Sequence, residues 1–95
     1  MNKYELAVVL NALIEDDDRS SLIDQIKSLI ERFGGTVTDT EGGEKRSLAY
    51  EIKKMKEGYY YFIHFTGAKD VPPNVEDRIR IIDNVLRYLV VSVEE

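Results

Sequence analysis

The sequence contains no cysteine and no tryptophan, and only one histidine, among its 95 residues. Without cysteine, the chain has no disulfide framework, no thiolate zinc site and no iron–sulfur cluster. One histidine leaves too few nitrogen ligands for most histidine-based metal sites. The longest apolar run, Leu6 to Leu10, is far shorter than the ~20 residues that cross a bilayer, and no secretion signal opens the chain. We therefore expect a cytoplasmic protein without metal, cofactor or membrane span.

The length and the missing motifs limit the class of protein further. A chain of 95 residues with 33% charged and 43% hydrophobic residues predicts a single globular domain over residues 1–95. There is no nucleophile elbow, and Gly34-Gly35 follows a helical pattern instead of opening one, which is the wrong polarity for a phosphate loop. His64 lies among strand aromatics with no acid at a fixed spacing, which favours a packed or partner-facing role. We expect no enzymatic activity and no catalytic residues.

Charge is distributed unevenly along the chain. The 13 basic and 18 acidic residues give a net charge of −5, which counts against general nucleic-acid binding, because phosphate neutralisation needs a basic surface. Acids gather in residues 14–18, in residues 39–44 and at Glu94-Glu95, whereas residues 45–56 hold five cations against Glu51, a net +4. This basic cluster is either a solvated hairpin end, where lysine discourages edge pairing, or a patch that attracts a phosphate backbone.

Consecutive acids precede the first helical pattern. Glu15 to Asp18 suit the positive N-terminal end of a helix, and Ser20 and Ser21 offer further capping oxygens. The acids lack the alternating spacing of a calcium loop. We therefore interpret the run as helix capping rather than metal binding.

Hydrophobic periodicity predicts four strands and two helices. The strands are Tyr4–Leu10, Thr36–Thr40 resuming at Leu48–Ile52, Tyr59–Thr66, and Leu86–Val93. Gly42-Gly43 interrupts the second of these and suggests a bulge, a bend or a loosely ordered stretch. The first helix carries the stripe Leu22, Ile26, Leu29, Ile30 and Phe33, and ends at Gly34-Gly35. The second begins near Pro72-Pro73 and carries Val75, Ile79 and Ile82. Lys53–Gly58 and Asp83-Asn84 are predicted turns.

This order predicts an α+β fold, the ferredoxin-like split βαβ sandwich. Right-handed crossovers place both helices on one face of a four-stranded antiparallel-type sheet, so the other face is free. One aromatic set of the strand Tyr59–Thr66 belongs on that free face. The two candidate sets are Tyr59, Tyr61, Ile63 and Phe65, or Tyr60, Phe62, His64 and Thr66. Because both sets are aromatic, the sequence leaves the choice open.

The same fold with strand aromatics raises the RNA-recognition motif as one hypothesis. The segment Lys56–Phe65 comes close to the signature sequence of that motif. However, aligning its last four residues, Phe62–Phe65, with the signature requires one extra residue, which turns their side chains to the opposite face of the strand. The segment Ala7–Asn11 lacks the stacking aromatic of that motif. A stand-alone RNA-recognition domain and a small-molecule-binding regulatory domain on this fold therefore stay as alternatives.

Four stretches in order resemble the S-six family of bacterial small-subunit ribosomal proteins. They are the opening Tyr4-Glu5, the signature-like Arg46–Lys53 with Leu-Ala-Tyr at its centre, Gly58-Tyr59-Tyr60, and Arg80–Tyr88. The resemblance covers nearly the whole chain. It implies a structural ribosomal protein that joins ribosomal protein S-eighteen and, with it, binds the central domain of small-subunit ribosomal RNA. A basic partner of that kind would explain how an acidic protein is held on RNA.

The resemblance and the basic cluster together suggest binding residues, each of which has a solvated charge as its alternative. The RNA-binding candidates are Lys3, Lys45, Arg46, Lys53, Lys54, Lys56, Arg80 and Arg87. The candidates for contact with the partner protein are Tyr60, Phe62 and His64. For most of the tyrosines Tyr4, Tyr50, Tyr59 and Tyr61, we expect a place in the core. Neither DNA nor a membrane is an expected partner.

Overall fold

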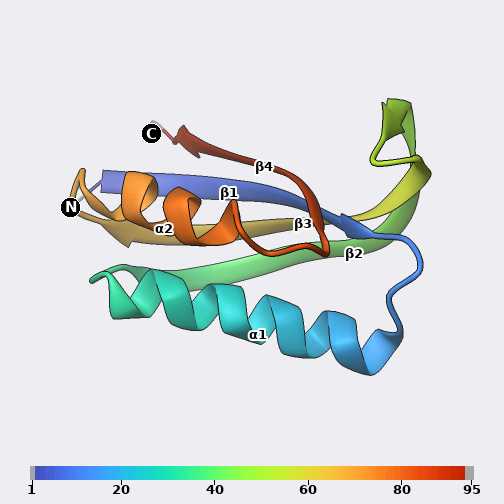
Figure 1. Cartoon of the computed structure of the whole chain (residues 1–95). Helices are drawn as coiled ribbons and strands as arrows, with labels where there is room; N and C mark the ends of the chain where they lie inside the picture. The colour runs from blue at the N-terminus through green and yellow to red at the C-terminus, as the bar shows by residue number, and fades with distance from the viewer. Residues whose placement is uncertain (1, 94–95) are drawn as a thin grey trace.

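The structure is a computed structural model that describes residues 2–93, so Glu94 and Glu95 lie outside the described residues. Its elements are β1 (Asn2–Asn11), α1 (Asp16–Arg32), β2 (Thr36–Ile52), β3 (Met55–Gly67), α2 (Val71–Ile79) and β4 (Val85–Ser92). Within the described range, they form a four-stranded sheet in the order β2-β3-β1-β4, with neighbouring strands antiparallel (Figure 1). The predicted ferredoxin-like sandwich is therefore confirmed.

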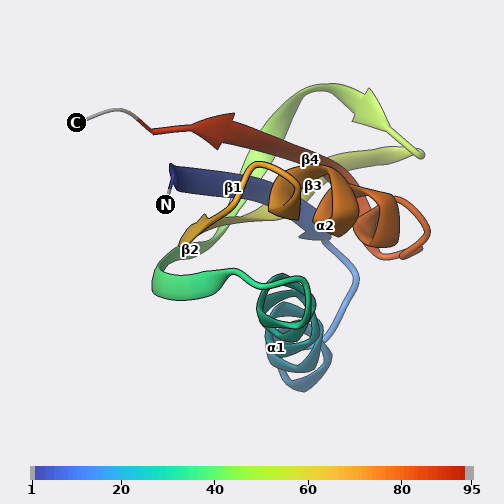
Figure 2. The same cartoon turned by 90° about the vertical axis from the view of Figure 1, so that its left-hand side faces the viewer.

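Both helices lie on the same side of the sheet, because both contribute to the same core (Figures 1 and 2). The buried side chains of α1 are Leu22, Ile23, Ile26, Leu29 and Ile30, and those of α2 are Val71, Pro72, Val75 and Ile79. α2 ends at Ile79, so Ile82, predicted as part of the helix stripe, packs against the core from the turn that follows. Pro72 lies in the first turn of α2, where its missing N–H costs no helical hydrogen bond.

The acidic run acts on α1 through charge rather than through capping hydrogen bonds. Residues 16–18 form the acidic first turn, and the N-cap residue Glu15 makes no side-chain capping bond. The carboxylates there favour the positive end of the helix dipole. Ser20 and Ser21, predicted as further capping residues, lie inside the helix, because the helix begins earlier than the apolar stripe suggested.

The register of the sheet settles which aromatic set of β3 is buried. Ile63 and Phe65 are fully buried, and Tyr59 and Tyr61 pack against the same core. Their partners on β1 are Leu10, Val8, Leu6 and Tyr4, of which the three aliphatic residues are also buried. Since side chains alternate along a strand, the other set points to the side without helices. We call that side the open face.

The β2–β3 hairpin is longer and more continuous than predicted. β2 runs through Gly42 and Gly43, which have φ of 102° and 98° and lie at a shift in strand register, so of the three alternatives for this pair they form the bulge. β3 begins at Met55 instead of Tyr59, so the turn shrinks to Lys53 and Lys54, with φ of 49° and 67°. The charged pair Lys56-Glu57 and the following Gly58 concealed this part of the strand.

Beyond the pair Asn11–Gly58, β2 and β3 have only each other as partners. We call this projecting part, residues 46–58, the hairpin arm. It extends past the end of β1 and bends away from α1 (Figures 1 and 2).

Arg19 anchors α1 to the sheet, a role that its place in an acidic segment did not indicate. Its guanidinium lies 3.8 Å from the ring centroid of Tyr59, and it donates hydrogen bonds to Tyr61 Oη at 3.4 Å and to the carbonyl of Ile14 at 3.2 Å. It also pairs with Asp16. The hydrogen bond to Tyr61 raises the pKa of Arg19 above its ordinary value, which favours the charged form that the contact with Tyr59 requires.

Replacing Arg19 with methionine keeps the length of the side chain but removes the charge and the donors. We expect Arg19→Met to lower the free energy of unfolding by about 1–3 kcal/mol, through loss of the cation–π contact and of hydrogen bonds. Urea denaturation followed by circular dichroism measures this. Lys27→Met, on the same helix, is the control and should stay within about 0.5 kcal/mol of the wild type. Equal stability of the two variants would contradict an anchoring role for Arg19.

Gly58 is required where the arm leaves the sheet. A Cβ at this buried position would lie 2.5 Å from Cγ1 of Val9 and 3.1 Å from the carbonyl oxygen of Leu10. Valine is stiff at χ1 and the carbonyl belongs to the backbone, so neither contact relaxes easily.

We expect Gly58→Ala to destabilise the protein by about 1–3 kcal/mol through overpacking. Thermal and urea unfolding would show the loss. Ser47→Ala changes an exposed residue opposite Glu57 on the same arm and should be near neutral. If Gly58→Ala leaves the free energy of unfolding unchanged, the contact with Val9 does not restrict the side chain at this position.

Candidate nucleic-acid and protein interface

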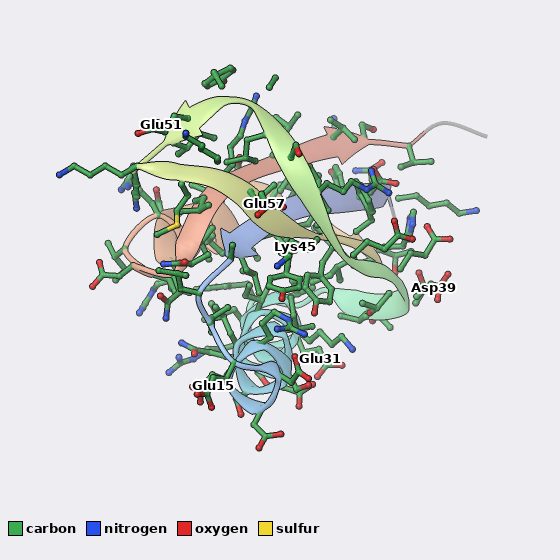
Figure 3. All side chains as sticks on the ribbon, turned by 90° about the vertical axis from the view of Figure 1, so that its right-hand side faces the viewer. Glu15, Glu31, Asp39, Lys45, Glu51 and Glu57 are labelled. Atoms are coloured by element: carbon green, nitrogen blue, oxygen red, sulfur yellow. The ribbon has the colours of Figure 1, made fainter. Side chains whose placement is uncertain are left out.

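The hairpin arm gathers most of the predicted RNA-binding residues. Arg46, Lys53, Lys54 and Lys56 lie on the arm, and Lys45 lies at its base opposite Tyr59. All five are exposed. Figure 3 shows Glu51 near the outer end of the arm, far from Glu15 at the start of α1 and from Glu31 within it. The fold thus holds the outer part of the arm apart from the acidic start of α1.

The other three RNA-binding candidates lie in three different places. Arg87 of β4 reaches the arm, because its guanidinium lies 5.7 Å from the ring centroid of Tyr50. Arg80 follows α2 and pairs with Asp77 at 3.3 Å. Lys3 is opposite Thr66, at the end of β1 away from the arm. The fold therefore brings five of the eight candidates, Arg46, Lys53, Lys54, Lys56 and Arg87, to the arm and the neighbouring end of β4. Lys45 lies on the helix side of the sheet with its pairing partner Tyr59, and Lys3 and Arg80 lie elsewhere.

The three partner-binding candidates, Tyr60, Phe62 and His64, all lie on the open face. The register places them in three rows across β3, β1 and β4. The rows are Tyr60–Val9–Arg87, Phe62–Ala7–Leu89 and His64–Glu5–Val91. Leu89 is 57% exposed and Val91 is 41% exposed. Apolar and aromatic side chains therefore cover the middle of this face without a helix above them.

One end of the open face is basic and hollowed. A hollow of about 250 Å³ has Ala7, Val9, Phe62 and Leu89 among its apolar lining. Tyr60, Tyr88, Arg46 and Arg87 complete the lining. The guanidinium of Arg46 lies 5.4 Å from the ring centroid of Tyr60, and its ion pair with Glu44 is long, at 3.5 Å, and exposed. Such an exposed pair leaves the arginine largely available to another anion.

The opposite end of the open face is acidic. His64 Nε2 lies 3.1 Å from a carboxylate oxygen of Glu41 and 3.5 Å from one of Glu5. No group of three or more acids and histidines in residues 2–93 is arranged to hold a metal ion. The open face can therefore bind an apolar surface in its middle, a cation at the Glu5 end and an anion at the Arg46 end.

Tyr50 is the residue that the sequence-based expectation of tyrosine burial missed. Tyr4, Tyr59 and Tyr61 pack against the core as predicted, but Tyr50 is 61% exposed. It lies on the arm, which has no sheet neighbour beyond β3 and no helix beneath it. Its position inside the basic cluster was the available signal, because an aromatic residue among exposed lysines is poorly placed for a core.

Comparisons with known proteins point to one family. A family model described as Ribosomal protein S6 matches residues 3–92. Small ribosomal subunit protein bS6 of Alkaliphilus oremlandii (strain OhILAs) is 38% identical over 95 residues, which cover 100% of both chains. The bS6 protein of Clostridium botulinum (strain 657 / Type Ba4) is 37% identical over 94 residues, which cover 99% of this chain and 100% of that one.

A solved structure agrees with these relatives. The crystal structure of 30S ribosomal protein S6 from Thermotoga maritima superposes with a TM-score of 0.91 and 27% sequence identity. The match covers 97% of this chain and 87% of that chain. No helix in the described part of the chain is long and apolar enough to cross a membrane. The resemblance found in the sequence is therefore confirmed, and the chain belongs to the ribosomal protein S6 family.

Proposed function

We propose that this protein docks through its open face on ribosomal protein S-eighteen, and that the pair binds the central domain of small-subunit ribosomal RNA through the hairpin arm. The family is one of structural ribosomal proteins, not of enzymes, so the protein is a small-subunit protein of the cytoplasmic ribosome. In this proposal the whole chain acts as one domain. The observation that carries it is the open face, which is apolar in its middle, charged at both ends and continuous with the arm.

The open face supports a protein partner. Exposed Leu89 and Val91 lie beside the half-buried ring of Phe62, and contiguous apolar surface of this kind usually marks an interface. β1 contributes Ala7 and Val9 to this face and no aromatic residue, so base stacking on two strands, as in an RNA-recognition domain, has no second platform here. A basic partner suits the acidic end at Glu5 and the net charge of −5.

The charge distribution supports RNA binding that is shared between two proteins. The arm and Arg87 offer a local basic region on a chain that is acidic as a whole. A few phosphate contacts give modest affinity and a shallow dependence on salt. A basic partner bound beside the arm would supply the remaining neutralisation.

Docking on the open face is tested with a charge placed at its centre. We expect Leu89→Asp to weaken binding of purified S-eighteen at least ~10-fold in calorimetry, because it puts a carboxylate into an apolar contact. The matched control is Ile81→Asp. Ile81 is 73% exposed but lies in the turn after α2, so its replacement should change the affinity less than ~2-fold. Equal affinity of both variants for S-eighteen would exclude the open face as the docking site.

The shared binding of RNA is tested by gel shift with a central-domain RNA fragment over a range of salt concentrations. We expect weak binding by the chain alone and tight binding after S-eighteen is added. Replacing Lys53, Lys54 and Lys56 together with glutamine should reduce the salt slope of the ternary complex by about 2–3, since each phosphate contact contributes about 0.7–0.9.

Two other lysines provide the control for that experiment. Lys27→Gln with Lys69→Gln removes charges from α1 and from the loop before α2, and should leave the salt slope unchanged. If S-eighteen adds nothing to the affinity, the proposed mechanism is wrong. Tight binding by the chain alone would favour a stand-alone RNA-binding domain.

A further inference from the structure

We infer that Tyr50 is a stacking platform for an unpaired RNA base, with Arg87 holding its ring in place. This inference rests on the proposed RNA-binding function and assigns one residue of the arm a specific ligand, a nucleobase. It concerns the π-face of Tyr50, whereas the lysines of the arm interact with phosphates through charge.

The exposure of Tyr50 is unusual among the tyrosines of the described chain. Tyr4, Tyr59, Tyr61 and Tyr88 pack against the core, and Tyr60 is half-buried on the open face beneath Arg46. Tyr50 alone among them is exposed, at 61%. A large aromatic ring left in solvent on a projecting arm makes no contribution to the core, which leaves its face accessible to a ligand.

An irregularity of the hairpin presents this ring. Ser47 is opposite Glu57 and Ile52 is opposite Met55, so residues 48–51 of β2 face only Lys56 on β3. Extra residues on one strand bend it and re-aim its side chains. Tyr50 lies inside this bulged segment, outside the regular pairing of β2 with β3.

Arg87 fixes the orientation of the ring from the other edge of the sheet. β2 and β4 are the two edge strands, yet the guanidinium of Arg87 lies 5.7 Å from the ring centroid of Tyr50. The arm therefore reaches across the end of the open face to β4. A cation over one face of an aromatic ring is attracted to it by about 0.5–1 kcal/mol at an exposed site. With 61% of the residue still exposed, the ring keeps area for a second stacking partner.

The surroundings identify that partner as a nucleobase. Residues 45–56 hold five cations and one acid, and Arg87 adds a further cation beside the ring. Aromatic rings set in a basic surface are how proteins hold single-stranded nucleic acid, with charges on the backbone and stacking on the bases. Bases stack on side chains where RNA is unpaired, in loops and bulges, so the proposed ligand is a base of that kind.

The test uses the complex of the full chain with S-eighteen and the central-domain RNA fragment, comparing Tyr50→Leu, Tyr50→Phe and the wild type. We expect Tyr50→Leu to weaken RNA binding roughly 5- to 100-fold at fixed salt, as loss of one stacked base does. Tyr50→Phe keeps the π-face and should bind within ~2-fold of the wild type. The salt slope should be the same for all three proteins, because no phosphate contact changes.

Chemical probing of the RNA gives a second readout. At least one unpaired base should be protected in the complexes of wild type and Tyr50→Phe and become reactive in the complex of Tyr50→Leu. Urea unfolding should show that Tyr50→Leu folds normally, as an exposed residue allows.

The outcomes separate this inference from the function on which it rests. If the wild-type complex does not bind the RNA, the proposed function fails and the inference falls with it. If the wild-type complex binds and Tyr50→Leu binds equally well, only the stacking inference is wrong. If Tyr50→Leu instead lowers affinity for S-eighteen, and the RNA effect vanishes at saturating partner, Tyr50 is a protein contact and the inference is overturned.

Discussion

One-sided coverage of the sheet is the constraint on which the rest of the molecule depends. Right-handed crossovers bring α1 and α2 to the same side, so every strand must bury alternate residues there and expose the others. β1 illustrates this: Leu6, Val8 and Leu10 enter the core, and Glu5 and Ala7 lie on the open face. The core and the open face are therefore made by the same strands, in one register.

Much of the fold was predictable because its signals are local and strong. The spacing of apolar residues identified α1 and α2, and the element order was enough to select the sheet topology. The buried face of β3 was not predictable, because Tyr60, Phe62 and Tyr61 are equally suited to either side. Pairing with the aliphatic residues of β1 decides it, and pairing is a long-range property that strand periodicity does not contain.

The residues whose place in the structure was not predicted from the sequence share one physical cause. Lys56 and Glu57 are charged yet belong to β3, because a hairpin pairs through its backbone and tolerates polar side chains on an exposed arm. Tyr50 is apolar enough for a core, but it lies on the arm, which has no helix or further strand beside it to form one. Arg19 lies in an acidic segment, and only the folded chain shows the rings of Tyr59 and Tyr61 beside it. In each case the neighbours come from another strand or helix.

The positions of the charges in the fold matter more for binding than their sum. Acids occupy the first turn of α1 and the end of the open face around Glu5 and Glu41, whereas the arm carries four cations against two acids. The Debye length at physiological salt is about 8 Å, so charges on opposite sides of the molecule hardly affect one another. A net charge of −5 consequently says little about the field beside the arm.

The turn at Lys53 and Lys54 shows what this charge separation costs in stability. Both residues have positive φ, a conformation in which two-residue hairpin turns strongly favour asparagine followed by glycine. A left-handed conformation costs an ordinary residue roughly 1–2 kcal/mol. The tip therefore holds two lysines where asparagine followed by glycine would make a more stable turn. The outermost point of the arm is thus built for charge at the expense of rigidity, and conversion of this pair to asparagine and glycine would exchange one property for the other.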